Sequence, residues 1–149
     1  MIARSFALAC VAALGACGGH RAVARAPEGD AHALQRPTLA QVYYWKARPG
    51  MLEAYNRYII DVAEPIDAEA QRQGAFISVT TYISRDTLTP WTHMRVFLLR
   101  DSAQLAGLSA ALDAAGRRLE PDSAKRRVRG EYAATLRDRV GSALLTVIP

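Results

Sequence analysis

From Leu39 onward, the spacing of apolar residues changes several times, and each change predicts a new element. Residues 41–47 are dense in β-branched and aromatic side chains and end at an Arg-Pro-Gly turn, which is typical of a strand. A helix up to Gly74 is predicted next, because apolar residues recur every three or four positions: Leu52, Tyr55, Ile59, Val62, Ile66 and Ala70. Pro65 lies inside this helix and has no N–H to donate to the preceding turn, so a kink or break is expected near Glu64.

The second half of the chain begins with a predicted strand pair. Residues 75–83 and 91–99 alternate apolar side chains with polar or aromatic ones, so they are expected to pair as antiparallel strands joined by the intervening loop. Asp101 and Gln104 have the spacing of a helix capping box. The helix that they begin is expected to end at Gly116.

A third helix is expected to start near Pro121, because proline suits the first turn of a helix, and to stop at Gly141. Its apolar face has helical spacing and consists of Val128, Tyr132, Leu136 and Val140. Residues 143–148 are mostly apolar and predict a last strand. The predicted order β-α-β-β-α-α-β is the ferredoxin-like plan with one helix added before the final strand. The expected fold class is therefore α+β, with an antiparallel sheet that has helices on one face.

Several short segments stand at the places where a known superfamily has similar ones. They are Lys46-x-Arg48-Pro49-Gly50 after the first strand, Met51-Leu52-Glu53 and Pro65 in the first helix, Gly74, and Arg100-Asp101-Ser102 after the third strand. In this pattern, residues 41–149 resemble the dimeric α+β barrels, which include small cofactor-less monooxygenases and stress-responsive barrel proteins. The resemblance implies a homodimer whose two sheets enclose a small-molecule cavity. No catalytic residue can be assigned from this resemblance, because no active-site motif of the superfamily matches the sequence position by position.

Strand alternation predicts which side chains meet the helices. In the third strand, the more uniformly apolar side is expected to face them: Thr92, Met94, Val96 and Leu98. In the second strand, Ile77, Val79 and Ile83 are expected on that side, and the residues expected on the cavity side are Phe76, Ser78, Thr80 and Tyr82. In the first strand the pattern leaves two choices for the cavity side, namely Tyr44 with Lys46 or Tyr43 with Trp45.

The candidate ligand site lies on the predicted cavity side. It is expected to combine four side chains: Tyr82, Trp91, His93 and Arg95. Together they offer apolar walls, a guanidinium that attracts anions and an imidazole that can exchange protons near neutral pH. We therefore expect the domain to bind a small hydrophobic molecule that bears a negative charge.

Two other functions remain open. His93 could act as an acid or base in a cofactor-less oxygenase or isomerase, although the predicted strand faces contain no Asp or Glu to assist it. His93 and Arg95 could instead form polar dimer contacts in a purely structural envelope protein. Neither a metal nor another cofactor is expected, because the domain has one histidine, no cysteine and no carboxylate cluster with ligand spacing.

The N-terminal segment predicts export. Residues 1–16 have the charge and apolar pattern of a signal peptide, and their uncharged run is shorter than the about 20 apolar residues that span a bilayer. Leu14-Gly15-Ala16-Cys17 resembles the bacterial lipobox, which implies cleavage before Cys17 and acylation of its thiol; a plain secretory signal is the alternative. Gly18 resembles the residue that follows the cysteine in outer-membrane lipoproteins, so the protein is expected in the bacterial cell envelope, facing the periplasm. Residues 17–38 are expected to form a flexible tether and residues 39–149 the folded domain.

The chain has an excess of basic residues, and some of them are clustered in the sequence. Of the 149 residues, 19 are Lys or Arg and 14 are Asp or Glu, which gives a formal net charge of +5. A basic run, residues 117–129, could contact anionic lipid headgroups. We favour the interpretation that it is a solvated helix face with pairs such as Arg127 and Glu131 at i,i+4. Nucleic acid is not an expected partner for an exported protein.

Overall fold

The computed structural model describes residues 36–148. The predicted signal peptide, Cys17 and nearly all of the predicted tether lie outside this range. The elements are β1 (Leu39–Ala47), α1 (Leu52–Tyr58), the π-helix η1 (Ile59–Ala63), α2 (Glu64–Arg72), β2 (Ser78–Ile83), β3 (His93–Leu99), α3 (Ser102–Leu119), α4 (Ser123–Leu136) and β4 (Arg137–Thr146). None of the helices within residues 36–148 has the length and apolar character needed to cross a bilayer.

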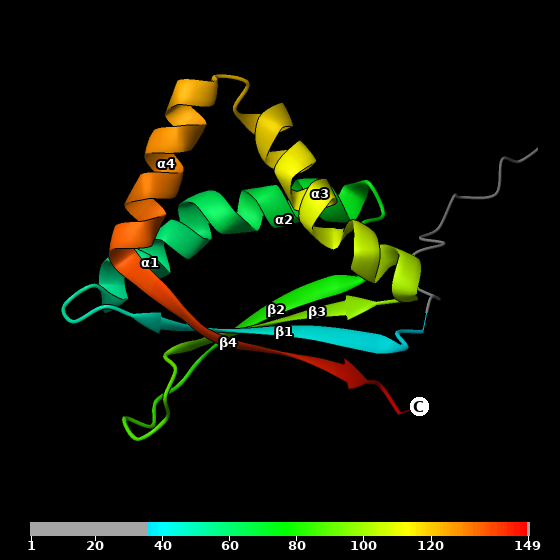
Figure 1. The fold of residues 1–149 in the computed structure, drawn as a ribbon, viewed down its shortest axis with the longest axis horizontal. Coiled ribbons are helices and arrows are strands. Elements are labelled where there is room, and N and C mark those ends of the chain that lie inside the picture. The colour runs from blue at the N-terminus through cyan, green and yellow to red at the C-terminus, as the bar shows by residue number, and fades with distance from the viewer. Residues whose placement is uncertain (1–35, 149) are drawn as a thin grey trace, which may run out of the picture.

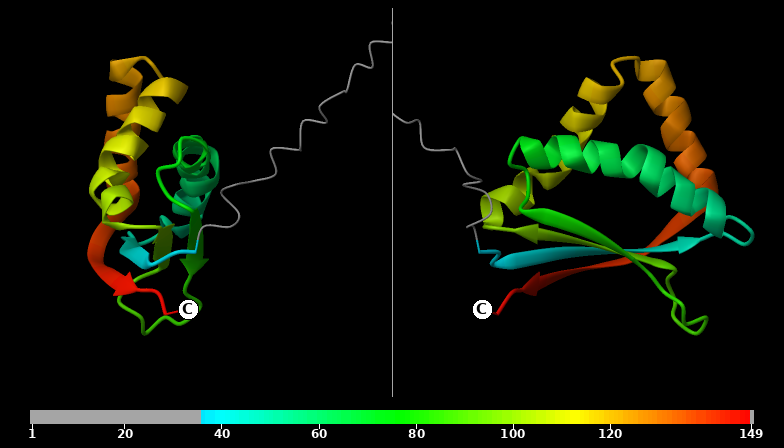
Figure 2. Two further views of the ribbon diagram at one scale, coloured as in Figure 1. Left: turned by 90° about the vertical axis from the view of Figure 1, so that its right-hand side faces the viewer. Right: turned by 180° about the vertical axis from the view of Figure 1, so that it is seen from behind.

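The strands form one four-stranded sheet in the order β2-β3-β1-β4, and every neighbouring pair is antiparallel. All helices lie on one side of this sheet, with α1 and α2 over β2 and β3, and α3 and α4 standing in front of them as an inverted V (Figures 1 and 2). The other side of the sheet has no covering element among residues 36–148. The predicted ferredoxin-like α+β fold is therefore confirmed.

The helix break that Pro65 predicts is present as a change of hydrogen-bonding pattern. The helix runs from α1 through the π-helical turn of η1, and Pro65 occupies the first turn of α2. A wider turn at this point accommodates a residue that cannot donate an N–H. At the far end, Gly74 has a φ of 77°, a left-handed conformation that suits glycine and ends the helix.

The start of α3 agrees with the prediction and its end does not. The Asp101 carboxylate accepts a hydrogen bond from the Gln104 N–H at 2.9 Å, as a helix cap requires. The helix then continues through Gly116 to Leu119. Gly116 lies where α3 crosses α2, and a Cβ there would be 3.8 Å from Cδ1 of Ile66. This is an ordinary van der Waals distance, so Gly116 lies inside the helix and does not end it.

The third predicted helix, α4, begins close to Pro121 as expected but ends before the predicted stop at Gly141. Asp122, and not Pro121, is the N-cap, and its carboxylate accepts from the Ala124 N–H at 2.8 Å. The helix stops at Leu136, so Val140 and Gly141 belong to β4 and not to a helical face shared with Val128 and Tyr132. Residues 137–142 pair with β1, and a register shift between Tyr44 and Trp45 accommodates the extra residue. Pairing along this strand overrides the helical spacing of the apolar residues.

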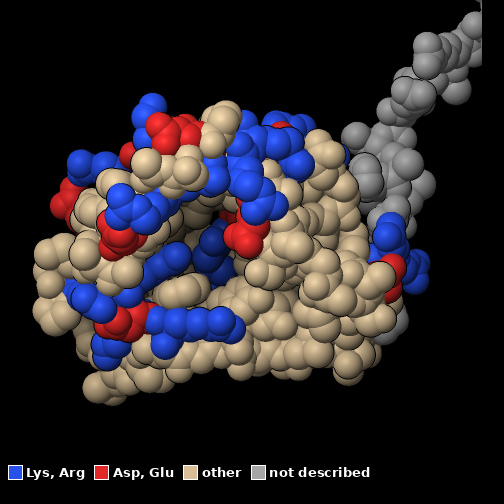
Figure 3. Space-filling model, turned by 45° about the horizontal axis from the view of Figure 1, so that its top comes forward, with Lys and Arg blue, Asp and Glu red and all other residues tan. Residues whose placement is uncertain are grey.

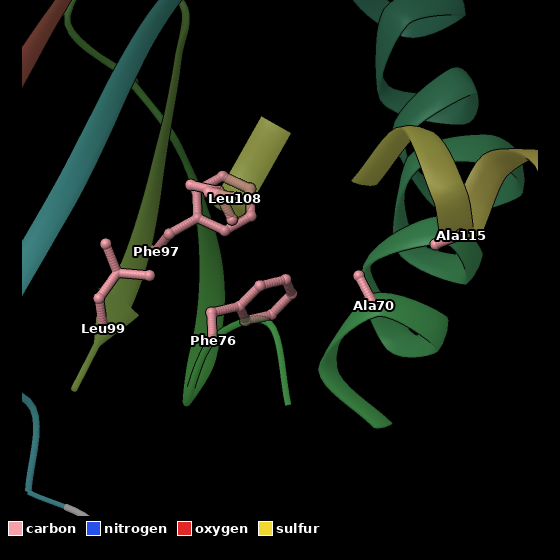
Figure 4. Close-up of a cluster of buried hydrophobic side chains, with 6 residues drawn as sticks. All are labelled: Ala70, Phe76, Phe97, Leu99, Leu108 and Ala115. Atoms are coloured by element: carbon pink, nitrogen blue, oxygen red, sulfur yellow. The ribbon is translucent and has the colours of Figure 1, made fainter. Parts of the chain in front are cut away.

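The main core lies between α2, α3 and the sheet (Figure 4). Its buried members are Ala70, Phe76, Phe97, Leu99, Leu108 and Ala115. The rings of Phe76 and Phe97 meet edge to face with centroids 5.2 Å apart. Phe76, which was predicted on the cavity side, is thus a core residue; it lies in the segment between α2 and β2, where strand alternation does not apply. A second cluster joins Ala47, Tyr55, Ile59 and Leu136 at the other end of the sheet.

The two faces of β3 are opposite to the prediction. His93, Arg95, Phe97 and Leu99 are buried under the helices, whereas Met94, Val96 and Leu98 lie on the open face and Thr92 precedes the strand. In β2, Val79 and Ile83 do face the helices, because they stand opposite Phe97 and His93 in the register. In β1, the pairing places Tyr43 and Trp45 on the helix side and Tyr44 on the open side. The more polar side of β3 is covered because α1 and α2 supply polar partners for it.

Candidate functional site

The four predicted site residues do not meet in one place. Tyr82 is about half exposed on the open face of the sheet. Trp91 lies just before β3, and its ring contacts Tyr44 of the open face with centroids 5.8 Å apart. His93 and Arg95 are on the other side, under α1 and α2. The expected pocket of Tyr82, Trp91, His93 and Arg95 is therefore split by the sheet.

His93 is fully buried and makes two side-chain hydrogen bonds. Its Nε2 lies 2.7 Å from Oδ1 of Asn56, and its Nδ1 lies 2.9 Å from the Thr92 hydroxyl. Burial, and to a lesser degree the charge of Arg137, lower the pKa of His93 to about 4. The ring is therefore neutral at pH 7 and has no carboxylate among its hydrogen-bond partners.

Arg95 forms a buried ion pair with Asp67 of α2. Its guanidinium also lies 5.3 Å from the centroid of the Phe97 ring, and its buried Nε has no hydrogen-bond partner. Burial raises the pKa of Asp67 to about 6 and outweighs the effect of the guanidinium. Because Asp67 balances its charge, Arg95 is not the group that a ligand anion would meet first.

Arg137, at the start of β4, lies in an aromatic cage that sequence reasoning missed. Its guanidinium carbon is 3.9 Å from the centroid of Trp45, 4.9 Å from that of Tyr55 and 5.5 Å from that of Tyr58. Its Nη1 donates to the Tyr55 hydroxyl at 2.6 Å. Arg137 is half-buried, and within residues 36–148 it has no carboxylate at ion-pair distance.

Arg139, two residues further along β4, faces the same side of the sheet. Its guanidinium lies 4.6 Å from the centroid of Tyr43, and it has no ion pair within the described part of the chain. The period-two spacing of Arg137 and Arg139 is a strand signal. This signal was not recognised in the sequence because the apolar residues around the two arginines also have helical spacing.

A pocket of about 270 Å³ lies above these residues, between α2, α3 and α4. Its lining includes the apolar Tyr58, Ile66 and Leu112 together with Asp113 and three arginines, Arg117, Arg126 and Arg129. Tyr58 connects this pocket with the cage of Arg137. Figure 3 shows a hollow here, with Lys and Arg side chains around and inside it. We call this space, together with Tyr43, Trp45, Arg137 and Arg139 beneath it, the basic hollow.

The basic run of α4 divides between two environments. Arg127 pairs with Glu131 at 2.7 Å on the exposed surface, as predicted. Arg126 and Arg129 are half-buried and line the pocket. Arg126 donates to the backbone carbonyl of Glu120 at 2.8 Å, and Arg129 lies 3.8 Å from the Glu120 carboxylate. Only the position of α4 beside α1 and α3 shows that half of this run faces inward.

The chain matches no protein-family model, and no curated protein matches it in sequence. Within the described residues, no group of three or more His, Cys, Asp and Glu side chains could hold a metal ion. Among solved structures, HapK from Hahella chejuensis is similar at a TM-score of 0.51 with 9% sequence identity, over 74% of this chain and 92% of that one. PA3566 from Pseudomonas aeruginosa gives a TM-score of 0.42 with 16% identity, over 77% of this chain and 96% of that one. The likeness to HapK shows the fold alone, and it places this chain among α+β proteins of the ferredoxin-like type.

Proposed function

We propose that the domain binds a small anionic molecule with an apolar or aromatic part, and that it does so in the basic hollow. The observation that supports this most directly is Arg137, a half-buried guanidinium without a carboxylate partner among residues 36–148. A buried charge is costly unless it is paired. A guanidinium that stacks on an aromatic ring keeps its edge free for a bidentate carboxylate or phosphate.

The other side chains of the hollow support the same ligand class. The Arg139 guanidinium lies over the Tyr43 ring, and the Arg117 side chain has no hydrogen bond or ion pair within the described part of the chain. Several cations around one concave surface raise its positive potential and attract anions. Tyr43, Trp45 and Tyr58 offer flat apolar walls, so a planar ring attached to the anionic group would fit this surface.

The ligand class can be tested with a charged probe and its neutral analogue. Naphthoate should bind the full chain at least about tenfold more tightly than naphthamide in calorimetric titration, because a charge-assisted hydrogen bond contributes about 1.5–3 kcal/mol. Arg137→Gln should remove this preference. Arg127→Gln, which changes an outward-facing arginine of α4, should leave it unchanged. Equal binding of the two probes would contradict the proposal, as would a preference that survives Arg137→Gln.

A homodimer is the second part of the proposal, and the open sheet face supports it. This face presents Tyr44, Met94, Val96 and Leu98 with no covering element among the described residues. An apolar surface of this kind is a liability in a monomer and is covered when a second copy packs on it. Light scattering should give the mass of a dimer, and Val96→Lys should give the mass of a monomer that remains folded.

The third part is a lipid anchor at Cys17, which rests on the lipobox resemblance. Expression in a Gram-negative host with a labelled fatty acid should label the chain, and Cys17→Ser should abolish the label. No observation favours the enzyme alternative, because the partners of His93 are an amide and a hydroxyl group and not a carboxylate.

A further inference from the structure

The pocket of the basic hollow is lined by guanidinium groups from two helices. Arg117 comes from α3, whereas Arg126 and Arg129 come from α4. A single carboxylate, that of Asp113, also lines the pocket. The lining therefore has an excess of two positive charges. Figure 3 shows Lys and Arg side chains gathered around and inside this hollow.

Arg126 is held in place by backbone carbonyl groups and not by a carboxylate. Its Nη1 donates to the Glu120 carbonyl oxygen at 2.8 Å and to the Pro121 carbonyl oxygen at 2.6 Å. Both Nη1 protons are thereby used, and the Nη2 and Nε donors have no acceptor within residues 36–148. Arg126 is half-buried, so this edge belongs to a guanidinium with a fixed position. Such an edge can bind two oxygens of one oxyanion.

Arg129 is brought to the same place by Glu120. Its Nη2 lies 3.8 Å from the Glu120 carboxylate, which is longer than a hydrogen bond. This carboxylate also accepts from the Asp122 N–H at 3.2 Å, and it does not line the pocket. Arg126 and Arg129 are three residues apart on α4, so their side chains lie on one face of the helix. The two guanidinium groups are therefore placed to bind one anion together.

Glycine occupies a position in the pocket lining on each of the two helices. Gly116 belongs to α3 and Gly130 to α4. A Cβ at Gly130 would have no other atom within 4 Å, so a larger side chain there would enter the pocket without a clash. Apolar walls come from Tyr58, Ile66 and Leu112. The pocket of about 270 Å³ thus has room for an anionic group with a ring beside it.

We propose that this pocket binds a phosphate monoester that carries an aromatic or apolar group. Two phosphate oxygens accept from the Nη2 and Nε edge of Arg126, the third accepts from Arg129, and the ring packs on Tyr58. A phosphate monoester carries two negative charges above its second pKa of about 6, which match the excess charge of the lining. A carboxylate or a phosphodiester carries only one.

The phosphate site is distinct from the edge of Arg137. Arg126 and Arg137 are eleven residues apart, which corresponds to about 16 Å along α4. The inference rests on the proposed function, because both anionic groups lie in one hollow, and it adds a second anion subsite to that hollow.

The ligand class is tested with two naphthyl esters by calorimetric titration of the full chain. At pH 7.5, naphthyl phosphate should bind at least about tenfold more tightly than naphthyl sulfate, which has the same tetrahedral shape and a single charge. At pH 5 this difference should shrink by about fivefold, because most of the phosphate then carries one charge. Vesicles of phosphatidylglycerol, a phosphodiester, should not displace naphthyl phosphate, and this distinguishes a small monoester from a lipid headgroup.

Two variants with matched controls locate the site. Gly130→Leu should abolish naphthyl phosphate binding, because it fills the pocket and removes no contact of the folded chain. Gly107→Leu is its control, because a Cβ there also has no neighbour within 4 Å and Gly107 does not line this pocket. Arg126→Gln should weaken naphthyl phosphate binding about tenfold. Arg127→Gln, which changes an arginine paired with Glu131 on the outer surface, should leave it unchanged.

The proposal is overturned if the phosphate and the sulfate bind equally at pH 7.5, or if Gly130→Leu binds naphthyl phosphate as the wild type does. The preference for naphthoate over naphthamide is measured in the same proteins. Arg126→Gln should keep that preference, whereas Arg137→Gln should lose it and still prefer the phosphate to the sulfate. A wild type that prefers naphthoate but not the phosphate contradicts only this inference, and the reverse result contradicts only the proposed function.

Discussion

The burial of His93 predicts a specific dependence of stability on pH. In the folded chain the pKa of His93 is about 4, against 6.5 for an unperturbed histidine. Between pH 4 and pH 6.5, His93 therefore takes up a proton in the unfolded chain but not in the folded chain. The contribution of neutral His93 to the free energy of unfolding is therefore complete above pH 6.5 and is lost as the pH falls toward 4. At 1.36 kcal/mol for each pKa unit, the loss is about 3 kcal/mol.

Asp67 opposes this effect over much of the same range. Its pKa is raised from 3.8 to about 6, so the folded chain binds this proton more tightly than the unfolded chain does. Protonation of Asp67 therefore adds stability as the pH falls from 6 toward 3.8. A pH profile of the wild-type protein alone would show only the difference between two effects of similar size.

The assay must therefore compare two proteins at each pH. We would measure urea unfolding of the wild type and of His93→Gln between pH 7 and pH 4. The glutamine amide can still donate to Asn56, but it does not titrate. The advantage of the wild type over the variant should shrink by about 3 kcal/mol across this range. A difference that stays constant within about 1 kcal/mol would refute the argument that burial keeps His93 neutral.

Three further predictions concern other parts of the structure. Arg95→Met should cost about 3–5 kcal/mol of unfolding free energy at pH 7, because it leaves the Asp67 carboxylate buried without a counter-charge, whereas Arg57→Met on the exposed side should cost little. Arg137→Lys should lower the free energy of unfolding by about 1 kcal/mol in urea titrations, since an ammonium cannot stack on Trp45 as a guanidinium does; an unchanged midpoint would argue against the cage. Phe97→Ala should cost about 3–5 kcal/mol in the same assay, whereas Val128→Ala, at an exposed position of α4, should cost less than about 0.5 kcal/mol.

Local signals in the sequence were enough for the elements whose boundaries depend on a few neighbouring residues. The cap at Asp101, the left-handed glycines at Gly50 and Gly74, and the interruption before Pro65 each follow from the chemistry of adjacent positions. The order of strands and helices followed from these boundaries. It was sufficient to identify the ferredoxin-like plan.

The boundary between α4 and β4 required the tertiary structure. Residues 137–140 fit a helix when they are considered alone, because Leu136 and Val140 are four residues apart. In the folded chain they extend along β1, and the ladder hydrogen bonds of this pairing outweigh the local preference. This single difference also places Arg137 and Arg139 on the sheet, where they become candidate ligand contacts.

Alternation along β3 shows that one side of the strand is mixed and the other apolar, but the side that the helices cover depends on the tertiary structure. Apolar character alone favoured burial of Met94, Val96 and Leu98. The helices instead bring Asn56 to His93 and Asp67 to Arg95, from positions 37 and 28 residues away. A buried polar group is tolerated when such partners meet it, and their meeting depends on how distant elements pack. Alternation along a strand defines two faces, but it contains no information about what will lie on each.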